Sequence, residues 1–205
     1  YIGGHGVSIG GMIVDSGNFD WEKAGSRFKM MNEPDPSYHG AVWSQAAKPL
    51  GPIAYILKAR VNLLRALGAA MRRFNAFKFL QGLDTLPLRI ERHCENTQKV
   101  ANFLSTHNKV SKTIYPSLMN DKPLERAKKY LNNSFGSLLG FELKNGEEAG
   151  RKFIDNLKLL FHVANIGDAR SLAIHPSSTT HSQLSEKEKL AAGVTPGYIL
   201  SLIHI

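Results

Sequence analysis

The feature that most constrains the fold is an alternation of short strands and helices in the second half of the chain. Apolar runs bounded by turn residues predict strands at 110–115, 137–143, 160–166 and 171–175. The helical spacing of apolar residues predicts helices at 124–130, 147–159 and 185–193. The last of these opens on Ser185, with Glu188 at capping-box spacing. The alternation predicts an α/β fold, with an open sheet and helices packed on it.

The stretch before this alternation has helical periodicity. It predicts one helix from Ile53 to Gly68, a second at 75–83 and a third at 86–106. Pro87 is compatible with the third helix because it falls in the first turn. A helix of about twenty residues spans about 30 Å, so the third helix is long enough to join two subdomains.

The first quarter of the chain is rich in glycine, proline and aromatic residues. Residues 1–15 predict a turn followed by a strand that ends at Asp15, with glycines where the backbone bends or passes close to a bulky group. Two prolines, Pro34 and Pro36, exclude a helix around them. We expect 16–52 to be a long irregular connection that is packed rather than disordered, because it contains both tryptophans.

The formal net charge of +9 does not indicate a nucleic-acid partner. The 26 Lys and Arg residues are spread over every segment, usually near one of the 17 Asp and Glu residues, as on solvated helix faces. No run of about 18 apolar residues exists to span a membrane. The single Cys94 excludes an intrachain disulfide and suits a reducing cytoplasm. We therefore expect a globular cytoplasmic protein without a nucleic-acid or membrane partner.

Several polar residues invite a functional interpretation, and most also have a simpler one. The loop histidines are His5, His39, His175, His181 and His204. They have no His-x3-His spacing on a helix, so we expect no metal site. Glu33, Asp35 and Asp168 could be acid or base groups, although turns and caps also use such residues. The hydroxyl-rich loop at 177–182 fits either a capped turn or hydrogen bonding to a polar ligand. The glycine turn at 3–6 could bind phosphate, but it precedes a strand and not a helix.

Taken together, these stretches resemble the pyridoxal-phosphate enzymes of cysteine and methionine metabolism, in particular the O-acetylhomoserine sulfhydrylase branch. The resemblance covers residues 1 to about 199. It is carried by the stretches 1–6, 9–11, 33–40, 74–77, 80–86, 89–93, 165–176 and 178–184. It implies a PLP-dependent transferase of fold type I (aminotransferase-like), with an incomplete large domain and a C-terminal α/β domain.

The resemblance also implies an activity. A parent enzyme of this branch is a homotetramer that uses pyridoxal 5'-phosphate (PLP) as an electron sink. It replaces the acetate of O-acetylhomoserine with sulfide and forms homocysteine in methionine biosynthesis. The Schiff-base lysine is expected immediately before Tyr1, and the groups that hold the cofactor lie further upstream. Asn165 matches the residue that helps to bind the substrate α-carboxylate, and Thr180 matches a position lining the same pocket.

Other activities remain open beside this one. Cystathionine γ-synthase and methionine γ-lyase are related PLP enzymes, although the insert at 32–40 favours the sulfhydrylase. From a different class, a non-catalytic interaction module could share the fold. Since the lysine and half of the cofactor site are expected outside this chain, we expect the chain by itself to be inactive.

The resemblance further suggests how the chain is divided. Residues 1–85 are expected to form the C-terminal part of the large PLP domain, and 86–199 the small domain, begun by the long connecting helix. The branch has a carboxylate-binding arginine after 194–199, whereas this sequence continues with Leu200 to Ile205 and contains no arginine there. Residues 200–205 match an in-frame reading of a sequencing adapter. We therefore expect them to be a non-native tail.

Overall fold

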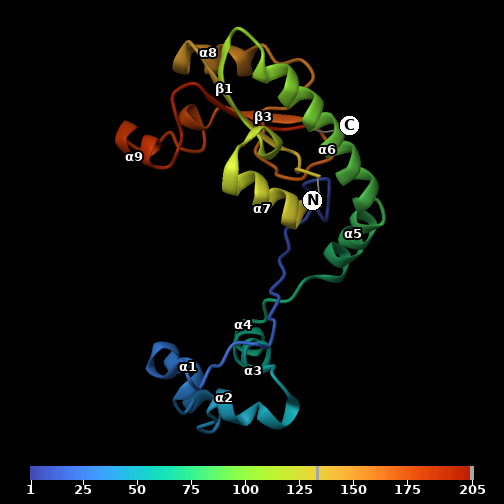
Figure 1. The fold of residues 1–205 in the computed structure, drawn as a ribbon. Coiled ribbons are helices and arrows are strands. Elements are labelled where there is room, and N and C mark those ends of the chain that lie inside the picture. The colour runs from blue at the N-terminus through green and yellow to red at the C-terminus, as the bar shows by residue number, and fades with distance from the viewer. Residues whose placement is uncertain (133, 204–205) are drawn as a thin grey trace. The chain divides into compact units, whose positions relative to one another are not determined.

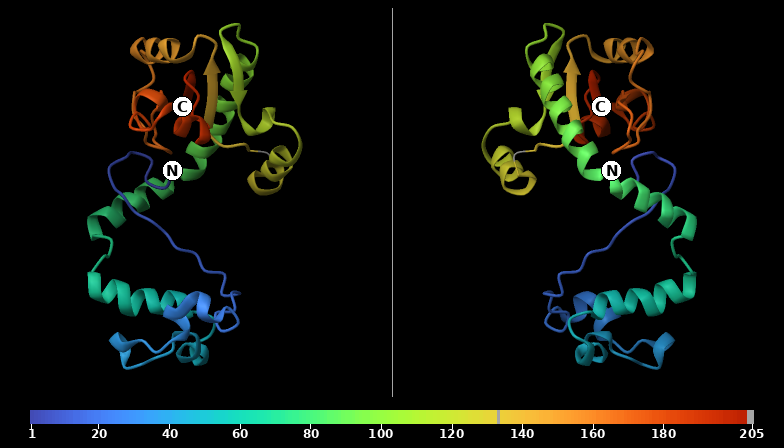
Figure 2. Two further views of the ribbon diagram at one scale, coloured as in Figure 1. Left: turned by 90° about the vertical axis from the view of Figure 1, so that its left-hand side faces the viewer. Right: turned by 90° about the vertical axis from the view of Figure 1, so that its right-hand side faces the viewer.

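The computed structural model describes residues 1–132 and 134–203 and divides the chain into two compact units. The first unit joins Tyr1–Ser8 to Phe74–Ile205, and the second is Ile9–Arg73. Figure 1 and Figure 2 show the helices and strands of each unit. In the part of the chain that is described, no helix combines the length and apolarity needed to cross a bilayer.

The first unit is built on a sheet of four short strands. They are β1 (Val110–Ile114), β2 (Leu138–Leu143), β3 (Leu172–Ile174) and β4 (Tyr198–Leu202). Their order in the sheet is β1-β2-β4-β3, and each neighbouring pair is antiparallel. The two central strands pair from Leu138 with Leu202 to Glu142 with Tyr198. The predicted open sheet is therefore present in the first unit.

Helices cover one face of this sheet. The helices of the unit are α5 (Arg73–Asp84), α6 (Leu86–Ser105), α7 (Asp121–Leu131), α8 (Gly146–Asp155) and α9 (Glu186–Ala191), with short 3-10 turns η5 (Pro116–Leu118) and η6 (Pro176–Ser178). Ala101 of α6 packs with Leu139, and Ile154 of α8 packs with Phe141. Leu139 and Phe141 are two residues apart on β2 and therefore share a face. The long helix α6 runs beside the strands in both figures.

The second unit is a cluster of short helices. These are η1 (Gly25–Phe28), α1 (Lys29–Asn32), η2 (Pro36–Tyr38), α2 (Trp43–Ala46), η3 (Lys48–Leu50), α3 (Ala54–Lys58), the π-helical η4 (Ala59–Leu64) and α4 (Arg65–Leu67). The buried residues Met31, Trp43, Ala47 and Ala54 form its core. Helix α4 ends at Gly68, whose φ of +64° is a left-handed value that glycine tolerates.

Many of the predicted elements are confirmed, with small shifts of their ends. The helix at 86–106 is α6, that at 75–83 is α5, and the helix from Ile53 to Gly68 is the continuous run α3–η4–α4. Ser185 caps α9 in a complete capping box with Glu188. The helix at 147–159 is shorter than predicted, because α8 ends at Asp155.

Three predictions about irregular and extended segments are wrong. Residues 9–14 form no strand, and Ile9 is 95% exposed, because no described strand lies beside them to pair with their backbone. The segment 160–166 makes only an isolated bridge at Phe161, since the chain turns away at Asn165. Residues 16–52 are packed, as predicted, but they contain short helices rather than one irregular connection. Pro36 is accommodated at the start of η2, where no N–H is needed.

One strand of the sheet was not predicted. Tyr198–Leu202 forms β4, which lies between β2 and β3 and is largely buried. Leu200 is expected to begin a non-native tail, and no strand is predicted there. The stretch contains Tyr198 and Ile199, which favour strands.

Candidate functional site

A tight turn at 165–168 forms the centre of the candidate site. The Asp168 N–H donates to the Asn165 carbonyl at 3.2 Å, and Gly167 has φ +83°, which is the arrangement of a type II turn. Position 167 also has no room for a side chain, because a Cβ there would overlap the backbone of Tyr1. Both the turn geometry and the contact with Tyr1 therefore require glycine.

The glycine turn at 3–6 packs against the turn at 165–168. The Ala169 N–H donates to the Gly4 carbonyl at 2.5 Å. A Cβ at Gly6 would lie 2.7 Å from Asn165 Nδ2 and 3.3 Å from Asp168 Oδ2. Gly6 also has a positive φ of +62°. The glycines of the opening stretch thus allow its backbone to approach the Asn165 amide closely.

Arg89 holds the other side of the glycine turn. Its Nη1 donates to the Tyr1 carbonyl at 2.9 Å, and its Nη2 donates to the Gly82 carbonyl at 2.6 Å. Its Nε donates to Thr85 Oγ1 at 3.0 Å. The residue is only 5% exposed, and burial lowers the pKa of its guanidinium. The first residues of the chain are therefore fixed between the start of α6 and the turn at 165–168.

Tyr1 connects this junction to the sheet. Its hydroxyl lies 2.5 Å from Ser137 Oγ, and its ring meets the His93 ring edge-on at 6.1 Å. His93 is fully buried, and its Nδ1 lies 2.7 Å from the Ile203 carbonyl. Burial lowers the pKa of His93, so the neutral ring is favoured, with Nδ1–H donating to that carbonyl.

Sequence reasoning did not identify Arg89 and His93 as site residues. Their spacing indicates a buried position, because Arg89 and His93 are four residues apart and lie on the face of α6 that also buries Thr97 and Ala101. Charged or titratable residues within a buried helix stripe require specific polar partners. The sequence alone did not show what those partners are.

Asp168 is the main charged group of the turn. It is 2% exposed and accepts hydrogen bonds from Arg170 Nε at 3.0 Å, from Arg170 Nη2 at 2.8 Å and from the Arg170 N–H at 2.9 Å. The Asn165 amide is the smallest contributor to the lowered pKa of Asp168, and its Nδ2 lies with Asp168 Oδ2 beside Gly6. The Arg170 guanidinium is the main reason that the pKa of Asp168 is lowered to about 2, so the carboxylate is charged at neutral pH.

Asn165 also borders a small hollow on the sheet face opposite α6 and α8. The hollow has a volume of about 110 Å³. Its lining is aliphatic apart from the asparagine: Leu138, Val163, Ala164, Asn165, Ile166, Leu172, Ile174, Leu200 and Leu202. An amide at the rim of an apolar hollow can bind a polar group while the hollow excludes water from it.

Thr180 lies outside these contacts. It is exposed, and its Oγ1 lies 2.9 Å from His181 Nδ1 in the hydroxyl-rich loop. That loop is organised by the buried His175, whose Nε2 donates to the Pro196 carbonyl at 2.7 Å while Nδ1 lies 2.8 Å from Ser178 Oγ. The capped-turn interpretation therefore accounts for the loop's observed hydrogen bonds.

The remaining candidates from the sequence do not come together. Within residues 1–132 and 134–203, no group of three His, Cys, Asp or Glu side chains could hold a metal ion. His204 lies outside the described residues. Glu33 makes a long, exposed ion pair with Lys29 at 3.9 Å.

Asp35 has a structural role in the second unit. Its Oδ2 accepts from Trp43 Nε1 at 2.8 Å, from Lys58 Nζ at 2.7 Å and from Asn62 Nδ2 at 2.7 Å, and its Oδ1 accepts from Ser37. The hydrogen bond from Lys58, followed by those from Ser37 and Trp43, holds the pKa of this carboxyl well below its usual range. These contacts account for Asp35 as a structural group that ties together η2, α2 and α3.

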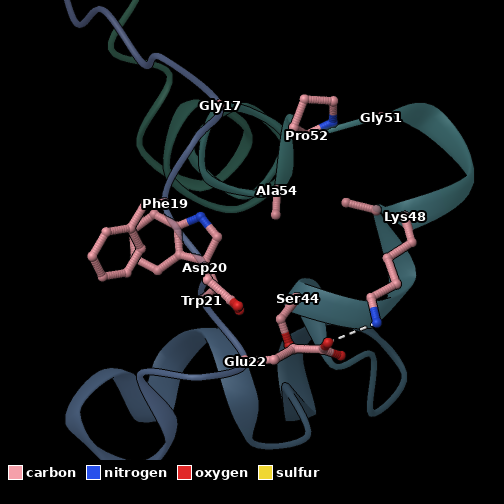
Figure 3. Close-up of a pocket in the computed structure, with 11 residues that line it drawn as sticks. Gly17, Phe19, Asp20, Trp21, Glu22, Ser44, Lys48, Gly51, Pro52 and Ala54 are labelled. Atoms are coloured by element: carbon pink, nitrogen blue, oxygen red, sulfur yellow. Dashed lines mark hydrogen bonds and ion pairs between the residues drawn. The ribbon is translucent and has the colours of Figure 1, made fainter.

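The second unit also has a hollow of about 160 Å³, shown in Figure 3. Lys48 and Glu22 form an ion pair at 2.7 Å beside it. Ser44 lines it with a buried hydroxyl that has no partner among the described residues. The ion pair neutralises Lys48 and Glu22, while Asp20, which also lines the hollow, accepts a hydrogen bond from the Lys23 N–H.

Comparison with known proteins gives one family and a consistent set of relatives. The family model described as "Cys/Met metabolism PLP-dependent enzyme" matches residues 1–202. The O-acetyl-L-homoserine sulfhydrylase of Leptospira meyeri is 54% identical over 97% of this chain and 46% of its own length. The homocysteine synthase of Schizosaccharomyces pombe is 46% identical over 100% of this chain and 47% of its own length. The chain thus spans about half the length of these relatives.

Solved structures give the same result. A putative O-acetylhomoserine (thiol)-lyase of Campylobacter jejuni, which carries N'-pyridoxyl-lysine-5'-monophosphate, is 43% identical with a TM-score of 0.75. The match covers 86% of this chain and 41% of that one. A cystathionine gamma synthase of Xanthomonas oryzae, in complex with aminoacrylate and cysteine, is 34% identical with a TM-score of 0.60, over 67% of this chain and 35% of that one.

Proposed function

Because the chain belongs to the family of PLP-dependent enzymes of cysteine and methionine metabolism, we propose that it is part of an O-acetylhomoserine sulfhydrylase. The predicted fold class, PLP-dependent fold type I, is confirmed by the match to the Campylobacter structure. The parent enzyme would convert O-acetylhomoserine and sulfide to homocysteine and acetate in methionine biosynthesis. The names of relatives at 54% and 46% identity support this reaction over others of the family.

The observation that carries the proposal is the Asn165 amide at the junction of the two turns. Its Nδ2 lies beside Gly6 together with Asp168 Oδ2, and with two hydrogens it could serve both Asp168 and the α-carboxylate of an amino-acid substrate. Thr180 would add a hydroxyl at another edge of the same pocket. Bound PLP acts as an electron sink at the reacting carbon.

The glycine turn is held tightly by its neighbours, because a side chain at Gly4 or Gly6 would meet Arg89 or Asn165. The Schiff-base lysine, which we expect immediately before Tyr1, would then join a backbone that Arg89 already holds. The chain supplies the substrate-carboxylate side of the site, and the rest of the parent supplies the cofactor contacts. By itself, therefore, the chain should form no specific PLP–lysine adduct. A stoichiometric adduct that survives removal of free PLP, as in the protein extended upstream, would contradict this.

The function is tested in the parent protein, extended to the length of its relatives and loaded with PLP. Homocysteine should form from O-acetylhomoserine and sulfide. Asn165→Ala should raise KM for O-acetylhomoserine by about tenfold and leave KM for sulfide unchanged, because only the amino acid carries the carboxylate. Thr180→Ala should raise the same KM by a smaller factor. Absence of homocysteine formation in a PLP-loaded parent would exclude the proposed reaction.

Cystathionine γ-synthase is the second candidate, favoured by the 34% identity to the Xanthomonas enzyme. The two activities differ in the sulfur nucleophile, which is sulfide in one and cysteine in the other. Competition between sulfide and cysteine in one assay with O-acetylhomoserine separates them. We expect sulfide to be used preferentially, and preferential formation of cystathionine would assign the second function.

Three further properties of the parent are part of the proposal. A homotetramer is expected, which light scattering would test, and so is a cytoplasmic location, which cell fractionation would test. We propose that the boundary between the large and small domains follows residue 85, where α6 begins. We also propose that residues 200–205 are not native, and sequencing the parent gene decides this.

A further inference from the structure

We propose that Asp168 is a positioning residue that fixes the orientation of the Asn165 amide and so sets how tightly the substrate carboxylate binds. The inference rests on the proposed function, because it assumes that Asn165 contacts that carboxylate. It adds a residue that has no contact with the substrate of its own. The contacts within the turn at 165–168 are the basis for it.

An asparagine side chain can be turned in either of two ways. Only the Nδ2 end donates hydrogen bonds, whereas the Oδ1 end would repel a carboxylate ligand. An ionised Asp168 accepts hydrogen bonds only. The Nδ2 end of Asn165 is the end that lies with Asp168 Oδ2 beside Gly6, since a Cβ there would be 2.7 Å from Nδ2 and 3.3 Å from Oδ2. The lowered pKa of Asp168 agrees with this, because the carboxylate keeps its charge over the whole neutral range. The correct end of the amide is thereby selected before the substrate arrives.

The neighbouring contacts keep both groups in place. Asp168 cannot rotate freely, because Arg170 binds it through Nε and Nη2, and the Arg170 N–H binds it as well. On the other side, Gly6 lies so close that a Cβ would come within 2.7 Å of Asn165 Nδ2. The Nδ2 end of the amide therefore has the Asp168 carboxylate and the Gly6 backbone as neighbours, while the residue as a whole is exposed.

Arg170 neutralises the negative charge of Asp168 beside Asn165. A negative charge one hydrogen bond away from Asn165 would repel an anionic substrate. The guanidinium of Arg170 forms a two-point pair with Asp168 and largely cancels that charge, while it remains partly exposed itself. The three residues Asn165, Asp168 and Arg170 thus present an oriented donor without a net negative charge.

The test is a double-mutant cycle in the PLP-loaded parent enzyme. Asp168→Asn should raise KM for O-acetylhomoserine by about tenfold with kcat changed less than about twofold, because an asparagine at 168 no longer accepts exclusively. In an Asn165→Ala background the same substitution should change KM less than about twofold. An equal effect of Asp168→Asn in both backgrounds would show a general structural role and overturn the inference.

A second readout avoids turnover. Calorimetry with L-homoserine, which lacks the acetyl leaving group, should show about tenfold weaker binding to Asp168→Asn, whereas L-homoserine amide, which lacks the carboxylate, should bind both proteins alike. Equal loss for both ligands would contradict the inference. If Asn165→Ala leaves KM and homoserine binding unchanged, the carboxylate role of Asn165 fails instead, and that result is distinct from a failure of Asp168 alone.

Two more variants keep the test valid if Asp168→Asn does not fold. Arg170→Gln removes the partner of Asp168 at an exposed position. It should weaken homoserine binding by about threefold, because the negative charge of Asp168 is then no longer neutralised. Unchanged binding in Arg170→Gln would argue against the inference. Asp155→Asn, an exposed substitution of the same type at the end of α8, is the matched control and should change neither KM nor binding.

Discussion

Arg89 donates a hydrogen bond of 2.9 Å to the backbone carbonyl of Tyr1, a residue 88 positions earlier in the chain. The same guanidinium binds the Gly82 carbonyl and Thr85, and it has no carboxylate partner among the hydrogen bonds described for it. A buried arginine that binds carbonyl groups fixes backbone rather than neutralising a charge. This contact holds the opening glycine turn against α5 and α6.

Replacing Arg89 by methionine should therefore destabilise the first unit. The carbonyls of Tyr1 and Gly82 would lose their donors in a buried place, and each such loss costs about 1–3 kcal/mol. Urea unfolding followed by circular dichroism measures the effect. Arg92→Met on the same helix is the control, because Arg92 is exposed and makes only a 3.5 Å ion pair with Glu95. Similar losses of unfolding free energy in both variants would contradict the proposed role of Arg89 in holding the backbone.

Replacing Gly6 by alanine should disturb both the turn and Asn165. The positive φ of +62° disfavours any side chain, at a cost of about 1 kcal/mol, and the new methyl would lie 2.7 Å from Asn165 Nδ2. We expect a lower unfolding midpoint and weaker homoserine binding in the parent. Gly11→Ala is the control, since a Cβ there meets no atom within 4 Å. Tighter binding in Gly6→Ala would refute the steric argument.

Acid should destabilise the second unit through Asp35. Because its pKa is lowered on folding, this carboxylate contributes stability that is full above the ordinary pKa of 3.8 and is lost as the pH falls below it. Both tryptophans, Trp21 and Trp43, belong to this unit, so their fluorescence reports its unfolding.

Asp35→Asn should remove part of this acid dependence and lower stability at neutral pH. The exposed Asp20→Asn should change neither, because Asp20 accepts only from the Lys23 N–H. Unchanged fluorescence of the wild type from about pH 6 down to about pH 2 would contradict the linkage.

Replacing Gly150 by alanine should destabilise the first unit, although alanine normally favours a helix by about 1 kcal/mol. A Cβ at this position of α8 would lie 2.5 Å from His175 Nε2, the atom that binds the Pro196 carbonyl. Thermal unfolding measures the change. Glu148→Ala on the same helix is exposed and should be nearly neutral. A higher thermal unfolding midpoint for Gly150→Ala would contradict the prediction, because it would show that α8 can shift away from His175 without losing stability.

The long helices were predictable because their signals are local. The stripe of α6 and the capping box of α9 depend on residues three or four positions apart. The strand β4 and the absence of a strand at 9–14 were not predictable, because a strand forms only where another strand lies beside it. Tyr198–Leu202 finds β2 and β3, whereas Ile9 and its neighbours find no described partner.

The candidate site was only partly predictable. Asn165 and Thr180 both come from the resemblance, and the substrate-binding role of each remains a prediction. The neighbours of the Asn165 amide have other interpretations in the sequence, because Gly6 belongs to a candidate phosphate-binding turn and Asp168 is an acid or base candidate or a turn former. Arg89 and His93 were not recognised, because their spacing in the sequence does not indicate that each binds a distant backbone carbonyl.

The sequence by itself determined the family, the fold class and the main helices, because these follow from local periodicity and extended motif similarity. Only the tertiary structure decided that the opening glycines enclose the Asn165 amide and that Arg89 holds them there. These contacts join residues more than eighty positions apart. These contacts form only because the folded backbone brings distant segments together, and the spacing of nearby residues does not predict which distant segments meet.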